Sequence, residues 1–406
     1  MKSKAPPNLV QHNSGSNPVT ANYPALLAYG FRPFFLLAGI HAAIAIPLWI
    51  AMLYGFDLPR TFLSAAVWHA HEMLYGFAAA AMAGFLLTAV PSWTNQRGYA
   101  GTPLAVLVLV WLAGRMVMTL PLGLPALWAG VIDLAFLPLL AMTILPALLR
   151  SGNRRNLVFI GLLGLLFASN LHFHLNAAAV IGPLLLGMNA MLFLVAMLGG
   201  RIVPAFTSAA LKQLGIDSRI RRYQPLDRAA LFAVVGVVLV DLFFPDSLYA
   251  AVMAAITAVL LSAQLSQWQG HKTLRVPIVS VLHIGYAWLP ICLALKAAVL
   301  LGAPIPGGSW LHALTVGAMA TMIMGVMSRA ALGHTGRALV APGAVVVGYV
   351  ALTGAALVRV FGPMLMPFAG SLWLVMAALL WCLAFLLFLM VYAPILCRPR
   401  IDGRPG

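Results

Sequence analysis

The sequence predicts an all-α polytopic membrane protein with twelve transmembrane helices. Of its 406 residues, 63% are hydrophobic and only 8% are charged, and the mean hydropathy is +0.98. Soluble domains contain about 25% charged residues, so this composition excludes a soluble globular protein. The apolar residues also fall into runs of roughly 20, the length that crosses a bilayer as a helix.

Twelve apolar runs are long enough to span the membrane. The third and fourth are separated only by a short Leu-Gly-Leu-Pro segment, which predicts a tight helical hairpin, and the fifth and sixth turn at Ile-Gly-Pro. The predicted spans are 33–54, 64–90, 103–121, 124–148, 156–180, 183–204, 228–245, 247–267, 276–301, 310–332, 341–361 and 369–396.

The chain is predicted to form a single membrane domain. No polar stretch is long enough for a soluble domain, so we assign residues 25–397 to one twelve-helix unit. Residues 1–24 are polar and rich in Pro, Asn and Ser, which predicts a disordered tail without the apolar core of a signal peptide. Residues 398–406 form a second short tail.

Basic residues set the predicted orientation. With the N-terminus on one side, that side receives 20 of the 24 Lys and Arg residues and the other side receives 4. Because cytoplasmic flanks are enriched in Lys and Arg, both termini are predicted to be cytoplasmic. The net charge of +16 therefore reflects membrane insertion, and nucleic acid is not an expected partner. The expected partner is the lipid bilayer.

The cysteines point to no metal site or disulfide framework. The three cysteines, Cys292, Cys382 and Cys397, have no close spacing. No Cys-x-x-Cys-His segment occurs, which excludes covalently attached c-type haem by its usual motif.

Five histidines are predicted to share one depth in the periplasmic half of the membrane. A rise of 1.5 Å per residue puts each about 6–13 Å outward of the midpoint of its helix. Ionisable side chains are costly inside a bilayer and call for a functional reason. Imidazole binds both haem iron and copper, so the layer predicts a metal or haem site. Its members are His69, His71, His172, His174 and His312.

Four of these histidines occur as two His-x-His pairs. The two histidines of one pair cannot easily bind the same metal ion. Neighbours at i and i+2 on a helix point about 200° apart, so each pair serves two sites. A shared His-x4-Gly-x7-Gly pattern begins at His71 and at His312. We therefore expect these two, with His172 or His174, to bind haem iron, and His69 and the remaining histidine to bind a second metal.

Other polar residues are candidates for supporting roles. His283, in the cytoplasmic half, is a further candidate metal ligand. Glu72 could orient a ligand histidine through its second ring nitrogen or carry a proton. Arg115 could pair with a haem propionate or extend to the membrane interface. Asn170 and Asn189 are expected to form hydrogen bonds between helices near the site.

The acidic residues Asp133 and Asp241 could belong to a proton path, but each lies near enough to a helix end that we expect it to be solvated. A weak internal repeat also links similar elements four or eight helices apart. It indicates three four-helix units.

In combination, several motifs resemble the NnrS family over about residues 24–396. The matching segments are Tyr29-Gly30-Phe31-Arg32-Pro33-Phe34-Phe35, Trp68-His69-Ala70-His71-Glu72-Met73, Leu171-His172-Phe173-His174, Gly200-Arg201-Ile202-Val203-Pro204 with Phe206-Thr207, His283, Ser328-Arg329 and Gly333-His334-Thr335-Gly336-Arg337. The resemblance implies a bacterial inner-membrane protein with non-covalent haem b and copper. It also implies a role in denitrification and in protection against nitric oxide and nitrosative stress.

The chain has a looser likeness to haem–copper oxidases and nitric oxide reductases, which arrange twelve helices in three four-helix arcs. A His-x-His in those proteins ligates two haems. This chain departs from them because it lacks the adjacent His-His pair that helps to hold copper there. The likeness therefore implies an arrangement of helices and puts a binuclear gas-reducing centre in doubt.

The leading hypothesis is a haem-binding and copper-binding membrane protein that acts in nitric oxide defence with a redox partner. Whether it turns over nitric oxide as a metal-dependent oxidoreductase stays open. Two alternatives remain: a twelve-helix secondary transporter, and a non-catalytic haem-linked sensor or maturation partner.

Overall fold

The computed structural model describes residues 23–55, 63–176, 180–216, 220 and 223–403. The predicted disordered tail at 1–24 lies almost wholly outside these residues, as do the last three residues of the C-terminal tail. The α-helices are α1 (Phe31–Leu53), α2 (Ala65–His71), α3 (Ala79–Thr94), α4 (Thr102–Thr119), α5 (Ala126–Leu134), α6 (Phe136–Arg150), α7 (Val158–Leu175), α8 (Ile181–Gln213), α9 (Gln224–Phe243), α10 (Leu248–Ser266), α11 (Pro277–Leu300), α12 (Gly308–His312), α13 (Thr321–His334), α14 (Gly343–Leu365) and α15 (Gly370–Cys397).

The all-α polytopic fold is confirmed. Several short helices join end to end, as in the continuous span Ala65–Thr94, so the fifteen α-helices of the described residues make twelve long rods. Eleven of the described rods are long and apolar enough to cross a membrane. The twelfth, α9, has 20 residues but carries Asp227, Arg228 and Asp241.

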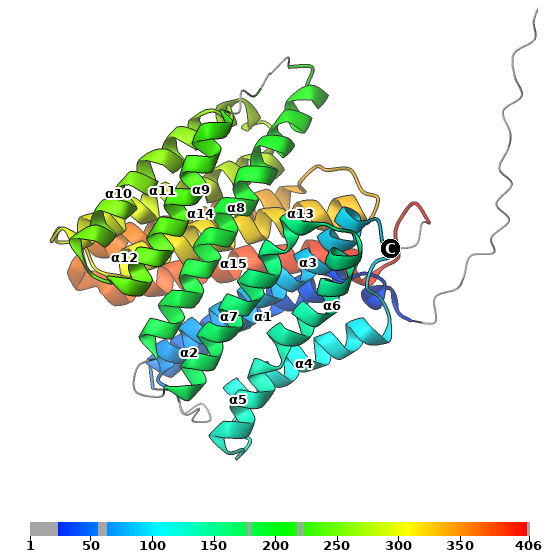
Figure 1. The fold of residues 1–406 in the computed structure, drawn as a ribbon, viewed down its shortest axis with the longest axis horizontal. Coiled ribbons are helices and arrows are strands. Elements are labelled where there is room, and N and C mark those ends of the chain that lie inside the picture. Colours follow the sequence, from blue (N-terminus) through cyan, green and yellow to red (C-terminus); the bar gives the residue numbers. More distant parts are fainter. Residues whose placement is uncertain (1–22, 56–62, 177–179, 217–219, 221–222, 404–406) are drawn as a thin grey trace, which may run out of the picture.

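The rods pack side by side into one bundle. The start of α1 and the C-terminal end of α15 lie at the same end of the bundle (Figure 1), which we call the terminal end. This arrangement agrees with an even number of crossings. The last helix, α15, packs against both α14 and α1 and so brings the end of the chain back to its beginning.

The sequence repeat divides the helices into three groups, α1–α6, α7–α10 and α11–α15, and helices of neighbouring groups pack as extensively as those within a group. In the first group α1 packs against the second rod, and in the third group α11 packs against the rod that contains α12 and α13. Contacts between α6 and α7, between α10 and α11 and between α15 and α1 join the groups.

Both rods that carry the His-x4-Gly-x7-Gly pattern contain a π-helical segment directly after the histidine. These segments are η2 (Glu72–Ala78), which follows His71, and η5 (Ala313–Ala320), which follows His312. π-helical turns are rare and frequently lie at functional sites. The repeated sequence pattern therefore corresponds to a repeated local backbone structure.

The glycines of this pattern allow close packing with the neighbouring helix. A Cβ atom on Gly76 would lie 2.3 Å from Nε2 of His41, and one on Gly317 would lie 2.4 Å from the Trp288 ring. Both distances are shorter than any non-bonded contact of a Cβ atom. Glycine at position 76 therefore allows α1 to approach η2, and glycine at position 317 allows α11 to approach η5.

We predict that Gly76→Ala destabilises the protein by about 1–3 kcal/mol, because the added methyl group forces the His41 ring to move in a packed core. The check is the thermal unfolding midpoint in detergent. Gly164→Ala is the control, since a Cβ there meets nothing within 4 Å. Equal stability of the two variants would contradict the prediction.

Candidate functional site

The span Ala65–Thr94 delivers two histidines to two different surroundings. His71 is fully buried in a network of charged side chains, whereas His69 lines an apolar cavity. One residue separates them, so their side chains leave the helix in nearly opposite directions. The His-x-His of this span therefore faces two regions, as its geometry requires.

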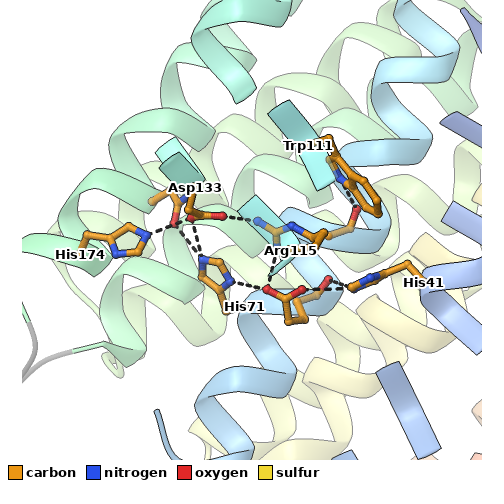
Figure 2. A network of polar contacts seen from close by, with 9 residues as sticks. His41, His71, Trp111, Arg115, Asp133 and His174 are labelled. Carbon is orange, nitrogen blue, oxygen red and sulfur yellow. Dashed lines mark hydrogen bonds and ion pairs between the residues drawn. The ribbon is translucent and has the colours of Figure 1, made fainter. Parts of the chain in front are cut away.

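The centre of the charge network is the pair of carboxylates Glu72 and Asp133, bridged by Arg115 (Figure 2). Arg115 donates through Nη1 to Oε1 of Glu72 at 2.6 Å and through Nη2 to Oδ1 of Asp133. Both carboxylate side chains are completely buried, and Arg115 is buried too. A charge at this depth is tolerable only with such a partner.

His71 lies between the same two carboxylates. Its Nδ1 is 3.1 Å from Oε1 of Glu72, and its Nε2 is 3.1 Å from Oδ1 of Asn170 and 3.3 Å from Oδ2 of Asp133. Two carboxylates and one guanidinium leave one negative charge uncompensated. A second cation, either a proton on the His71 imidazole or a metal ion, would balance it, because both ring nitrogens face oxygen acceptors.

Helix α7 supplies the remaining side of the network. His174 Nε2 lies 2.9 Å from Oδ2 of Asp133, and Asn170 Nδ2 donates to the same oxygen at 2.8 Å. His71, Asp133 and His174 each offer one ligand atom, and these three atoms lie within 4.8 Å of one another. Two imidazoles and a carboxylate are a donor set that copper accepts.

His41 extends the network towards α1. Its Nε2 is 3.1 Å from the backbone oxygen of Glu72 and 3.4 Å from Oε2 of the same residue. Trp111 donates to the backbone oxygen of Gly76 at 3.3 Å. These contacts hold the π-helical turn η2 in place, because π-helical turns leave carbonyl groups available to partners outside the helix.

The cavity on the other side of the span has a volume of about 280 Å³, near the lower end of the range for ligand pockets. Its lining is apolar except for the imidazoles of two histidines, the hydroxyl of one threonine, the indoles of two tryptophans and the guanidinium of one arginine. It is lined by Ile46, Trp49, Ala66, His69, Ala70, Met73, Leu74, Met188, Leu311, His312, Thr315, Val316, Met319, Ala355, Arg359, Leu374, Ala377, Ala378 and Trp381.

The two cavity histidines have free nitrogen atoms. His312 Nδ1 donates to the backbone oxygen of Gly308 at 2.6 Å, which leaves its Nε2 as the unprotonated nitrogen. His69 stacks on Trp49 with ring centroids 3.9 Å apart, and its buried Nδ1 has no hydrogen-bond partner among the described residues. Arg359 likewise has no ion pair within the described part of the chain.

The structure groups the predicted histidines differently from the sequence. His312 shares a cavity with His69 rather than with His71, and His174 joins His71. His172 is exposed on the outside of the bundle and accepts a hydrogen bond from Asn176 at 3.3 Å. Helix α7 therefore brings only one member of its His-x-His pair to the network.

Two further predicted site residues, His283 and Asn189, have other surroundings. His283 Nε2 bonds to the hydroxyl of Thr207 at 2.8 Å, away from both groups of histidines. Asn189 donates to Oδ2 of Asp241 at 3.0 Å, and Lys296 donates to the same carboxylate oxygen. Asn189 thus supports an ion pair between α9 and α11 and does not contact a histidine.

The roles expected of the acidic and basic residues also change. Asp133 was expected to be solvated but is buried at the centre of the network. Arg115 bonds to protein carboxylates through both terminal nitrogens and does not extend to the interface. Asp133, Arg359 and His41 were not predicted as site residues. The repeat held a signal for Arg359, which follows His312 by 47 residues much as Arg115 follows His71 by 44.

We predict that Arg115→Gln destabilises the protein by about 3–5 kcal/mol, because it leaves two buried carboxylates without their cation. Thermal unfolding in detergent measures the effect, with the exposed Arg150→Gln as control. Adding Glu72→Gln to Arg115→Gln removes one of the stranded charges and is expected to recover part of the loss. A destabilisation no larger than that of the control would refute the role given to Arg115.

Comparison with known proteins agrees with the fold and the motifs. The family model described as NnrS protein matches residues 25–400, nearly the whole chain. A search of curated proteins found no match to the chain. The matched region contains both the charge network and the cavity. The chain belongs to the NnrS family of multi-pass membrane proteins.

Proposed function

We propose that this chain binds haem b in the cavity between His69 and His312 and acts there in the nitric oxide response. Membership of the NnrS family supports a role in that response at a general level. The observation that carries the haem proposal is the meeting of two imidazoles from distant segments, α2 and α12, in a largely apolar cavity.

The residues present suit haem. Imidazole nitrogens are axial ligands of haem iron, and the Nδ1–H of His312 is already fixed by Gly308, as ligand histidines require. His69 would supply the second imidazole. Arg359 lines the cavity without an ion pair to any described residue and would bind a propionate. Bound haem would supply iron that coordinates nitric oxide or exchanges one electron.

We propose the His71–Asp133–His174 group as the place for copper. Its donors are close together and its uncompensated negative charge favours a cation. It adjoins the haem cavity because His69 and His71 belong to the same helical turn. In the absence of copper, a proton on His71 would take the place of the metal in the charge balance.

Buried Glu72 and Asp133 also resemble the membrane-embedded acids of proton-coupled transporters. Arg115 neutralises one of these charges, and neither carboxylate lines the cavity. The haem hypothesis therefore ranks above the transporter hypothesis.

We expect His69→Ala and His312→Ala each to lose most of the Soret absorbance of the purified protein, since each removes one iron ligand. Optical spectra and the haem-to-protein ratio measure the loss. His172→Ala is the control, because that histidine is exposed and bonds only to Asn176. Wild-type spectra in both cavity variants would overturn the haem assignment.

We expect His174→Ala to lose bound copper while its haem content stays at the wild-type value, because only the charge network loses a donor. Elemental analysis of purified protein gives the metal content. His172→Ala, two residues away on the same helix, again serves for comparison. Retention of copper in His174→Ala would show that copper binds elsewhere.

A further inference from the structure

Another cavity, of about 180 Å³, lies among α8, α9, α10 and α11 towards the terminal end of the bundle. It is distinct from the charge network and from the haem cavity, and none of its residues lines either of them. Its lining residues include three arginines, Arg155, Arg201 and Arg228, and one acid, Asp227.

The three arginines reach the cavity from separate segments of the chain. Arg155 lies in the short 3-10 helix Arg154–Asn156 before α7, Arg201 lies within α8, and Arg228 lies in the first turns of α9. Arg155 and Arg228 are exposed, and Arg201 is half-buried. The bundle therefore brings together three cations that are far apart in sequence.

Their positive charges are incompletely balanced. Arg201 Nη1 donates to the neutral amide oxygen of Asn156 at 3.3 Å, and none of the three arginines forms an ion pair with any described residue. Asp227 accepts a hydrogen bond from Gln264 at 2.8 Å and is the one acid among the described residues that line the cavity, against three arginines. An anion in the cavity would relieve the repulsion that remains.

The floor of the cavity is fixed by buried polar groups. Tyr286 is completely buried and donates to Oε1 of Gln264 at 2.6 Å, and Gln264 in turn donates to Asp227. These hydrogen bonds fix one side of the space that the three arginines line.

We propose that this cavity binds a phosphate group through Arg155, Arg201 and Arg228. The planar guanidinium fork matches phosphate oxygens in pairs and holds its charge at every physiological pH. The phosphate group could come from either of two sources. One is the head group of an anionic phospholipid, which lies at the membrane surface where basic residues flank the helices. The other is phosphate in solution. The site is independent of haem and copper.

The test measures binding to the full-length protein from two sources. In the first arm, inorganic phosphate is titrated against protein in neutral detergent at constant ionic strength, and the unfolding midpoint reports binding. In the second arm, the protein is placed in nanodiscs of phosphatidylcholine with or without phosphatidylglycerol, and the unfolding midpoint is compared. Each arm uses wild type, Arg155→Gln, Arg201→Lys and Arg228→Gln, with Arg150→Gln as control.

We expect stabilisation by one source in wild type and in Arg150→Gln, and an affinity about tenfold weaker in each glutamine variant, since each loses a charge-assisted contact. Arg201→Lys keeps the charge but loses the fork, so its affinity is also expected to fall. Stabilisation by phosphate assigns a soluble ligand, and stabilisation only by phosphatidylglycerol assigns a lipid. No stabilisation in either arm, or equal stabilisation of wild type and all three cavity variants, would overturn the proposal.

Discussion

The buried ion triad of Glu72, Arg115 and Asp133 is the interaction on which the centre of this membrane protein depends. Ionised groups are costly in a bilayer, and none of these three would be stable there alone. Together they join the second rod to α4 and α5, and Asp133 extends the connection to α7. The same contacts fix His71, so stability and site geometry arise from one network.

Polar groups recur where the three helix groups meet. Asp133 of the first group bonds to His174 of the second, and Asp241 of the second bonds to Lys296 of the third. Between the third group and the first, His312 and His69 line a cavity instead. Two of the junctions thus contain a carboxylate bonded to a basic side chain. The third combines the cavity with hydrogen bonds from Arg32 of α1 to backbone oxygens at the C-terminal end of α15.

A single helical turn couples the two candidate metal sites. His69 faces the cavity and His71 faces the charge network, and the π-helical turn η2 begins directly after them. Because the two histidines lie two residues apart on one helix, the two candidate sites share a backbone segment. This arrangement is consistent with haem and copper acting in one process, as proposed for the nitric oxide response.

The sequence by itself determined the membrane fold, the twelve rods and the two-way geometry of His69 and His71, because hydropathy and helical periodicity are local properties. It also identified Glu72 and Asn170 as neighbours of a histidine site. Only the tertiary structure decided that Asp133 is buried, that His172 is exposed and that His312 lines the same cavity as His69. Depth along a helix axis can be counted from sequence, but which face of a rod meets which neighbour depends on how all the rods pack together.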